Sequence, residues 1–146
     1  MSGVKLTDIV EKMNLKNLTP EVDITEREVL VPDVNRPALQ LAGFFDHFDL
    51  NRVQIIGNVE CAYLETLAEE KRVEIYQKLL EHKVPCIIFS NELQPDESFI
   101  EIAQKNDIPV FGTCKKTSSF MGEMIRWLNV KLAPCISIHG VLVDVY

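Results

Sequence analysis

Apolar and polar residues follow a regular pattern in the second two thirds of the chain. Short apolar runs occupy residues 52–57, 85–90 and 108–111, and after each of them apolar residues recur every three or four positions. Short apolar runs bounded by glycine, proline or polar residues are typical of buried strands, and the longer period is typical of amphipathic helices. The pattern therefore predicts three strands, each followed by a helical region.

The predicted helical regions differ in length and in their apolar faces. The first is long, and we expect the charged run at residues 69–72 to mark a junction between two helices. The second begins at Pro95, with carboxylates in its first turn, where the helix dipole favours them. The third carries an apolar stripe of Met121, Met124, Ile125 and Leu128, flanked by Phe120 and Trp127.

The N-terminal third is less regular. We expect a short amphipathic helix capped by Thr7, a polar connection over residues 14–25, a strand over residues 28–31, and a helix that begins at Pro37. Threonine is a common helix cap, and proline suits the first position of a helix because its missing N–H has no partner there.

The alternation of strands and helices predicts the fold class. Successive strands joined by helices favour a parallel sheet with right-handed crossovers. The strands are apolar throughout, as is expected when helices cover both faces of a sheet. We therefore expect an α/β protein with an open, mostly parallel sheet and crossover helices, to which the N-terminal third adds a mixed or antiparallel edge.

Composition and charge narrow the possible partners. The 146 residues are 47% hydrophobic and 25% charged, which suits one ordinary globular domain. The formal net charge of −7 argues against nucleic acid or an anionic membrane as a general partner. No signal peptide and no long uncharged apolar run occurs, so we expect a cytoplasmic protein. The cysteines, expected to be reduced thiols, are widely spaced: Cys61, Cys86, Cys114 and Cys135.

The segment after the third predicted strand is a candidate anion-binding site. Open α/β sheets bind ligands at the carboxyl ends of their strands, where helix N-termini present free N–H groups. Here the candidate residues are Gly112, Thr113, Lys115, Lys116, Thr117 and Ser118. The segment is not a P-loop, because Cys114 rather than glycine precedes the lysine. The alternative is that Thr117 or Ser118 only caps the helix while the lysines are solvated.

The histidines show no catalytic constellation by spacing alone. His47 lies among aromatic residues and His82 at a helix end, where structural roles are usual. His139 precedes Gly140 and the β-branched run 141–146, which predicts a strand. From these properties alone, His139 is expected to be a hydrogen-bonded core residue.

The β-branched run at residues 141–146 predicts how the chain is divided into domains. A strand needs neighbours to satisfy its backbone groups, and nothing follows residue 146 to supply them. We therefore expect a fragment, with an N-terminal α/β domain over residues 1–133. Residues 134–146 would then be a linker and the first strand of a truncated second domain.

Four segments together resemble the N-terminal domain of bacterial HPr kinase/phosphorylase. They are NRPALQLAGFFD at 35–46, RVQIIG at 52–57, IPV at 108–110 followed by Thr117 and Phe120, and IHGVLVDVY at 138–146. The last segment is the most specific, since in that family it leads into the strand and phosphate-binding loop of a C-terminal P-loop kinase domain. The resemblance runs from about residue 30 to the end of the chain.

The resemblance implies an activity that needs more than this chain. Members of the family phosphorylate a serine of the phosphocarrier protein HPr with ATP or pyrophosphate and Mg²⁺. They also remove that phosphate by phosphorolysis, in carbon catabolite regulation. The family's catalytic histidine falls on His139, and its full-length form is a hexamer. Because the family's P-loop lysine, magnesium ligands and catalytic aspartate lie beyond Tyr146, we expect this fragment to be inactive.

The role of the domain itself stays open between two interpretations. The family's N-terminal domain is similar in fold to the uridine-nucleotide-binding domain of the Mur ligases, but a fold does not transfer a ligand. The domain is either a structural and regulatory module that helps to set the oligomer, or a sensory module that binds a small anion, sugar phosphate or nucleotide at residues 112–119. Exposure of Phe44, Phe45 or Trp127 would instead indicate a protein-docking surface.

Overall fold

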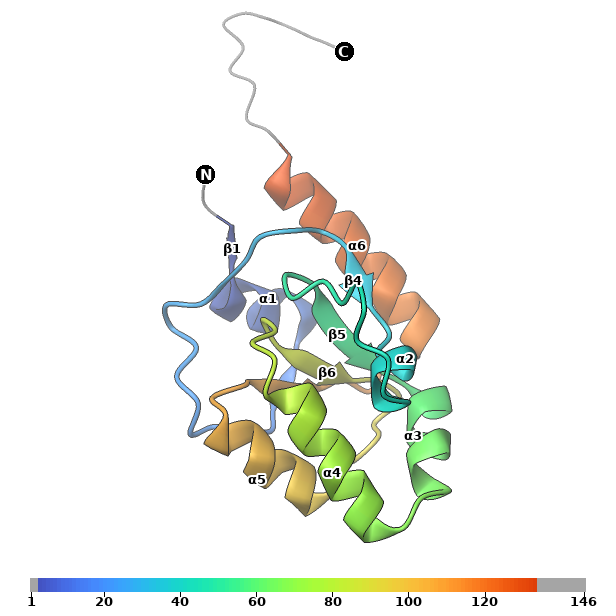
Figure 1. Ribbon diagram of the computed structural model, residues 1–146. Coiled ribbons are helices and arrows are strands. Elements are labelled where there is room, and N and C mark those ends of the chain that lie inside the picture. Colours follow the sequence, from blue (N-terminus) through green and yellow to red (C-terminus); the bar gives the residue numbers. More distant parts are fainter. Residues whose placement is uncertain (1–2, 134–146) are drawn as a thin grey trace, which may run out of the picture.

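A five-stranded sheet forms the middle layer of the structure, a computed structural model that describes residues 3–133 (Figure 1). In spatial order its strands are β2 (Lys16–Asn17), β7 (Val110–Gly112), β6 (Ile87–Phe89), β5 (Val53–Ile56) and β4 (Val34–Asn35). β4 to β7 are parallel, and β2 pairs antiparallel with β7. The predicted fold class and its antiparallel edge are confirmed.

The register of the central strands separates the core into two apolar clusters. Ile55 pairs with Ile88, which pairs with Phe111, and all three side chains are fully buried. This row packs against α1 (Leu6–Met13) and α6 (Thr117–Leu132) on one face of the sheet. Neighbouring positions such as Ile87 and Phe89 point to the other face, because successive strand residues alternate.

The second face is covered by α3 (Asn58–Glu65), α4 (Glu69–Leu80) and α5 (Glu97–Lys105). Figure 1 shows α4 and α5 side by side across the sheet, with α3 beside the lower end of α4. Helices on both faces explain why the central strands contain almost no polar residue. The one exception, Gln54, is fully buried and hydrogen-bonded.

A small second sheet lies at the N-terminal end. It pairs β1 (Val4–Lys5) with β3 (Glu28–Val29) in antiparallel register. The buried stripe of α6 consists of Phe120, Met124 and Leu128, spaced four residues apart. Phe120, expected at the side of this stripe, therefore belongs to its centre.

Several predicted boundaries were wrong. Thr7 does not cap the first helix, because α1 begins at Leu6 with Lys5 as its N-cap. The junction between α3 and α4 lies at residues 66–68, and residues 69–72 form the first turn of α4. Acidic residues in that turn are favoured by the positive end of the helix dipole, which accounts for the charged run.

Three strands were not predicted, and one of them is β1, which lies where the sequence suggested only the approach to a helix. β2 lies within the connection expected at residues 14–25, and β4 ends at Asn35, two residues before Pro37. Each has two residues, too few for an alternating pattern, and each is held by pairing with a strand distant in sequence. The helix expected after Pro37 is α2 (Ala38–Leu41).

Three expectations fall on residues that the structure does not describe. His139, Cys135 and the strand expected at residues 141–146 lie outside the described residues. Among the residues that are described, no helix is long and apolar enough to span a membrane.

Candidate functional site

The carboxyl ends of the four parallel strands meet along one edge of the sheet, where polar side chains form a connected network. Arg36 follows β4, Gly57 follows β5, Ser90 follows β6, and Thr117 opens α6 after β7. In an open α/β sheet this edge is the usual location of a binding site. The sequence of each loop determines which contacts form there.

Arg36 and Glu60 form the most buried ion pair of this edge. Arg36 Nη2 lies 2.6 Å from Glu60 Oε1, and the Glu60 side chain is only 2% exposed. The same carboxylate oxygen accepts the N–H of Gly57 at 2.8 Å and so satisfies a backbone donor at the start of α3. Arg36 Nε is buried and has no hydrogen-bond partner among the residues described.

Gly57 is required at its position because other side chains occupy the adjacent space. A Cβ atom on this residue would lie 2.7 Å from Thr117 Oγ1 and 2.9 Å from Arg36 Nη2. Its φ of −121° is accessible to any residue, so the requirement is steric rather than conformational. The glycine therefore allows the loops after β4, β5 and β7 to approach one another.

Thr117 connects the start of α6 to the loop after β6. Its Oγ1 lies 2.5 Å from Ser90 Oγ and accepts a hydrogen bond of 3.0 Å from Asn91 Nδ2. Helix α6 has Lys116 as its N-cap, with no side-chain cap. The idea that the Thr117 or Ser118 hydroxyl caps the helix is therefore wrong, because the Thr117 hydroxyl is bonded to the neighbouring loop.

Asn35 and Gln40 form a second network within the NRPALQ segment. Asn35 Nδ2 donates to Gln54 Oε1 at 2.7 Å and to Gln40 Oε1 at 3.2 Å. Gln54 Nε2 in turn donates to the carbonyl of Arg52 at 2.9 Å. These bonds satisfy a buried amide on β5 and fix α2 against the edge of the sheet.

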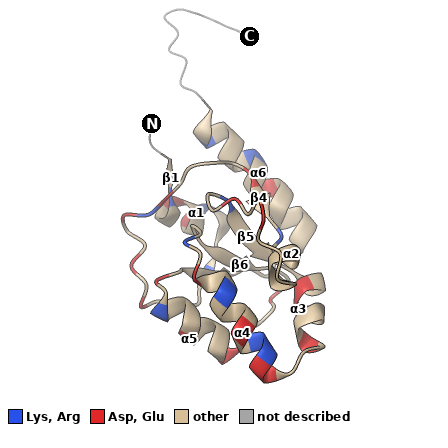
Figure 2. Cartoon of the chain, viewed as in Figure 1, with Lys and Arg blue, Asp and Glu red and all other residues tan. Residues whose placement is uncertain are grey.

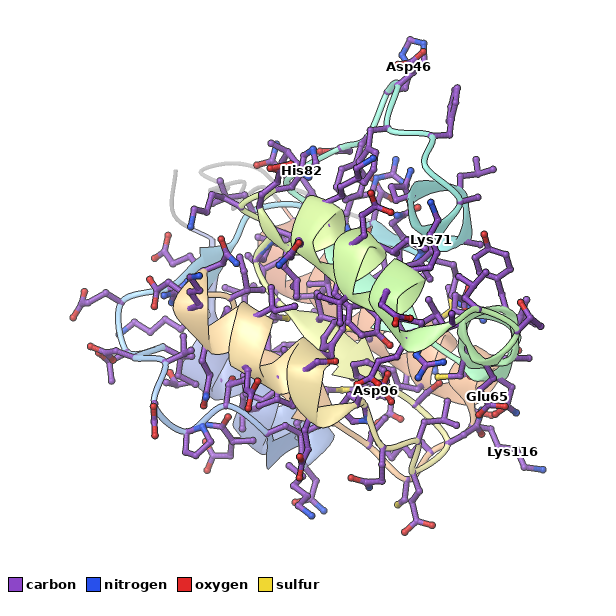
Figure 3. The ribbon with its side chains drawn as sticks, turned by 60° about the horizontal axis from the view of Figure 1, so that its bottom comes forward. Asp46, Glu65, Lys71, His82, Asp96 and Lys116 are labelled. Carbon is purple, nitrogen blue, oxygen red and sulfur yellow. The ribbon has the colours of Figure 1, made fainter. Side chains whose placement is uncertain are left out.

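The six candidate anion-binding residues run from the end of β7 through the connecting loop into the first turn of α6, and the structure gives them different environments. Gly112 ends β7, Thr113 is 7% exposed, and its hydroxyl accepts the N–H of Lys115 at 3.2 Å. Lys116 is exposed and extends away from the protein in Figure 3, and Ser118 is also exposed.

Lys115 is not a free cation. Its Nζ donates to Glu123 Oε1 at 2.8 Å, and Glu123 is the seventh residue of α6, in the second turn. This hydrogen bond lowers the pKa of the Glu123 carboxyl from its usual value. The pairing leaves Lys116 as the lysine of the loop that an anion would meet first.

Two successive residues in the left-handed region tie this loop to the preceding one. Asn91 and Glu92 have φ values of 58° and 56°, which are uncommon for residues other than glycine. In this conformation their N–H groups donate to the carbonyls of Lys115 and Thr113. A cavity of about 230 Å³ lies beside this junction and is bounded by Asn14, Lys16, Leu18, Glu92, Leu93, Gln94, Gly112, Thr113 and Cys114.

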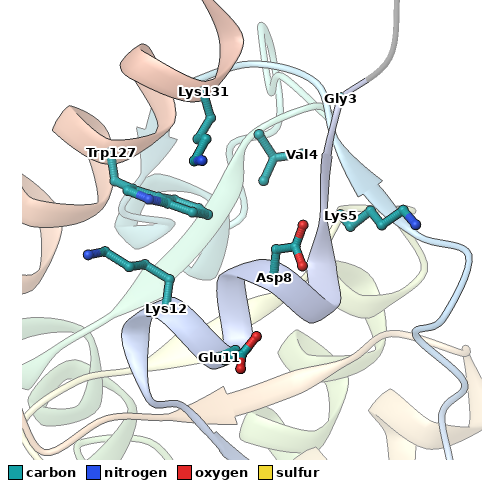
Figure 4. A pocket seen from close by; sticks show the side chains of 8 residues that line it. All are labelled: Gly3, Val4, Lys5, Asp8, Glu11, Lys12, Trp127 and Lys131. Atoms are coloured by element: carbon teal, nitrogen blue, oxygen red, sulfur yellow. The ribbon is translucent and has the colours of Figure 1, made fainter.

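A larger groove, of about 600 Å³, runs between α1 and α6 (Figure 4). Trp127 projects into it, with Lys131 Nζ 5.7 Å from the centre of the ring. Three lysines and two carboxylates line the groove: Lys5, Lys12, Lys131, Asp8 and Glu11. Since both signs of charge are present, the lining favours neither an anion nor a cation.

Phe45 and His82 pack against each other near α2, whereas Phe44 and His47 are exposed. Phe44 is 48% exposed, whereas Phe45 is partly buried. The Phe45 ring stacks on His82 with the centroids 4.5 Å apart. His82 Nδ1 lies 2.9 Å from the carbonyl of Lys78, so this nitrogen is the donor. His82 therefore has a structural environment, as expected.

The thiols and acidic residues described by the structure form no metal centre. Within residues 3–133, no group of three or more His, Cys, Asp or Glu side chains is arranged to hold a metal ion. Burial raises the pKa of the Cys86 thiol to about 12. Burial, followed by the charge of Glu60, raises the pKa of Cys61 to about 11. Both thiols therefore stay protonated at neutral pH.

Comparison with known proteins decides the family. A family described as "HPr Serine kinase N terminus" matches residues 4–128, which include every loop of the network above. The chain belongs to this family. The match includes both Arg36 and Glu60.

Several HPr kinase/phosphorylases are similar in sequence over nearly the whole chain. The protein of Lachnoclostridium phytofermentans is 57% identical over 146 residues, which are 100% of this chain and 47% of that protein. The protein of Caldicellulosiruptor bescii is 41% identical over 94% of this chain and 44% of its own length. The protein of Bacillus subtilis is 33% identical over 100% of this chain and 47% of its own length. This member of the family thus spans about half the length of these relatives.

A solved structure shares the fold. The CBS and DRTGG domains of the regulatory region of a Clostridium perfringens pyrophosphatase, complexed with the activator diadenosine tetraphosphate, give a TM-score of 0.61. The likeness covers 92% of this chain and 53% of that chain, at 20% sequence identity. At this identity the likeness supports the fold alone.

Proposed function

We propose that the chain is the N-terminal regulatory and structural module of a bifunctional HPr kinase/phosphorylase. In this proposal the whole enzyme phosphorylates a serine of HPr with ATP or pyrophosphate and Mg²⁺, and removes the phosphate by phosphorolysis. The observation that carries the proposal is the 57% identity to one such enzyme over the full length of this chain. The module itself serves to position the catalytic core and to help set a homo-oligomer, a hexamer in the full-length protein.

The proposal divides the chain between two domains. Residues 1–133 form the module, and residues 134–146 are the linker and first strand of the P-loop kinase domain. His139 would act near the transferring phosphoryl group, where an imidazole can orient the reacting groups or neutralise developing charge. The sequence contains no G-x-x-x-x-G-K-[ST] segment, so ATP or pyrophosphate and Mg²⁺ would be held by residues other than those of this chain.

One experiment tests the assignment at the level of activity. The parent reading frame is extended past Tyr146, and the longer protein and the 146-residue chain are each incubated with HPr, Mg²⁺ and either ATP or pyrophosphate. We expect phosphoserine on HPr with the longer protein and none with the chain alone. Phosphorylation by the chain alone, or a longer protein without a phosphate-binding loop, would refute the proposal.

A second experiment tests the modular role. Residues 1–133 are deleted from the parent protein, and oligomeric mass and HPr phosphorylation are measured by light scattering and by phosphoserine detection. A structural and regulatory module predicts that the deletion changes the oligomer, the rate, or the response of the rate to metabolites. Identical mass, rate and response would contradict it.

A second candidate function is a small-anion, sugar-phosphate or nucleotide sensor at Gly112, Thr113, Lys115, Lys116, Thr117 and Ser118. The observation that favours it is that these residues lie on the loop before α6 and in its first turn, where the N–H groups of the helix favour an anion, and that Lys116 is exposed. The Lys115–Glu123 ion pair weakens anion binding at Lys115, because the anion would compete with a carboxylate that lies 2.8 Å from the ammonium group.

Ligand-dependent melting tests this second function. Phosphate, sugar phosphates and nucleotides should each raise the melting temperature by mass action if the site binds them. Changing both Lys115 and Lys116 to Ala should abolish the rise. Changing Lys71 and Lys78 of α4 to Ala removes the same charge elsewhere and should leave the rise unchanged. If no anion shifts the melting temperature, only the structural and regulatory module remains.

A further inference from the structure

An apolar hollow of about 170 Å³ lies where α3, α4 and α5 meet, apart from the networks described above. Its apolar walls come from three helices and one strand: Cys61 and Leu64 of α3, Tyr76 of α4, Phe99 of α5, and Phe89 of β6. Pro95 and four polar residues, Glu65, Arg72, Gln94 and Asp96, complete the lining. The hollow opens at the carboxyl end of the sheet, between the end of α3 and the first turn of α5.

The aromatic walls of the hollow are held in fixed positions. The Phe99 ring packs edge-to-face against Tyr76 and against Phe89, with centroids 5.1 Å and 5.2 Å apart. The Tyr76 hydroxyl donates to Asp96 Oδ2 at 2.6 Å. Arg72 Nε donates to the same oxygen at 3.2 Å, and Arg72 Nη1 donates to the carbonyl of Leu67 at 2.7 Å. The hollow is therefore formed in advance, which lowers the entropic cost of filling it.

A second, acidic hollow of about 430 Å³ shares Arg72 and Asp96 with the first. Its other lining residues are Glu69, Glu97, Ser98 and Glu101. Arg72 is paired with Asp96, so it leaves the three glutamates without an ion pair among the residues described. Figure 2 shows acidic positions gathered where α3 joins α4, and Figure 3 shows Asp96 and Glu65 on this same side of the molecule.

Negative side chains also outnumber positive ones at the apolar hollow, because Glu65 and Asp96 line it together with Arg72. After burial, the causes that raise the pKa of Cys61 are the negative charges of Glu60, Glu65 and Asp96. An apolar group that enters the hollow therefore does so most favourably when a positive charge accompanies it.

The size of the apolar hollow and the charge of the acidic hollow together indicate the kind of occupant. Pockets for small ligands usually measure about 300–1,000 Å³. The apolar hollow is smaller, at about 170 Å³, and matches one large side chain. The acidic hollow beside it is open and suits lysine or arginine. We propose that the two hollows together dock a short segment of a partner protein, in which one large apolar side chain lies next to basic residues.

This docking site is independent of the proposed kinase role and of the anion site. It uses α3, α4 and the first turns of α5, whereas the anion candidates lie on the loop before α6 and in the first turn of α6. Binding would thus be measurable on the 146-residue chain, whatever the activity of a longer protein.

Three blocked peptides test the proposal on the ¹⁵N-labelled chain: Gly-Leu-Lys-Lys-Gly, Gly-Leu-Glu-Glu-Gly and Gly-Gly-Lys-Lys-Gly. We expect saturable amide shifts at residues 61–65, 69–76 and 96–101 with the first peptide alone. Its affinity should fall as salt is added. The absence of saturable shifts with the first peptide would overturn the proposal. Equal binding of the peptide without leucine would also overturn it, since that result indicates general attraction of cations.

Two double variants, each with two glutamates changed to lysine, are compared in their affinity for the leucine-lysine peptide. Glu97→Lys with Glu101→Lys should weaken binding of the leucine-lysine peptide roughly tenfold. Glu21→Lys with Glu26→Lys makes the same change of charge on an exposed segment away from the hollows and should leave the affinity unchanged. Equal losses in the two double variants would show that only the net charge matters and would refute the site. Because all four glutamates are exposed, these variants are expected to fold.

Discussion

Arg36 Nη2 lies 2.6 Å from Glu60 Oε1, and this contact joins the loop after β4 to the first turn of α3. The Glu60 carboxylate is 2% exposed, whereas Arg36 keeps 32% of its side chain in solvent. Of the two partners, only the Glu60 carboxylate is therefore fully buried. Most of its importance lies in preventing an uncompensated charge at Glu60, because a buried carboxylate without a partner is costly.

Replacing Arg36 by Met should destabilise the fold by about 2–4 kcal/mol, near the lower end for a broken buried pair. The reason is that Glu60 would retain the Gly57 N–H but lose its only ionic partner among the residues described. Urea unfolding measures the loss. Lys71→Met breaks the exposed Lys71–Glu74 pair and should cost no more than about 1 kcal/mol. Equal losses in the two variants would contradict this role of Arg36.

Gly57→Ala should destabilise the protein by about 1–3 kcal/mol, because the new Cβ overpacks the contact between Thr117 and Arg36. Gly122→Ala is the matched control. No atom lies within 4 Å of a Cβ at Gly122, in the exposed part of α6. There alanine should stabilise by about 0.5–1 kcal/mol through helix propensity. Thermal or urea unfolding of both variants checks that the free energy of unfolding falls in Gly57→Ala and rises in Gly122→Ala. A similar fall in both variants would contradict the steric argument.

Thr117→Val should cost about 1–2 kcal/mol, because it removes the oxygen that meets both Ser90 and Asn91. The change preserves the shape of the side chain, so the loss reports on the hydrogen bonds. Thr117→Ser keeps the hydroxyl and should recover most of the stability. If the serine variant is no more stable than the valine variant in urea unfolding, the hydroxyl is not the stabilising group.

The free energy of unfolding should fall as the pH rises above about 9. Burial raises the pKa of the Cys86 thiol from 9.0 to about 12, so in this range the unfolded chain loses a proton that the folded chain keeps. The unfolded state then binds fewer protons, and stability decreases with pH.

The Cys86→Ala variant should show a flatter decline over pH values from about 8 to about 11, measured by urea unfolding. The remaining slope belongs to other groups, including Cys61 and Tyr76, whose pKa values burial also raises. A Cys86→Ala slope equal to that of the unaltered chain would disprove the assignment.

The sequence predicted those parts of the fold that repeat a local pattern. The central strands and their helices follow from apolar periodicity, because burial on two faces leaves a continuous apolar run. β2 and β4 have no such signal, since their conformation depends on partners distant in sequence.

The candidate site was predictable only in part. The loop at residues 112–119 and the NRPALQ segment were visible in the sequence. Glu60 was one of 22 acidic residues with nothing to distinguish it, and its role depends on burial beside Arg36. Similarly, the bonds of Thr117 to Ser90 and Asn91 could not be predicted from spacing, because they join loops that only the sheet topology brings together.

The two outer strands of the sheet are short, and this limits how copies of the protein can associate. β2 and β4 have two residues each, and both residues of β2 are exposed and polar. An edge this short offers few free backbone groups to a second chain, so it protects against edge-to-edge aggregation. Assembly of several copies would therefore rely on side-chain contacts between surfaces. In such an oligomer the sheets of neighbouring subunits would stay separate, without backbone hydrogen bonds between their edge strands.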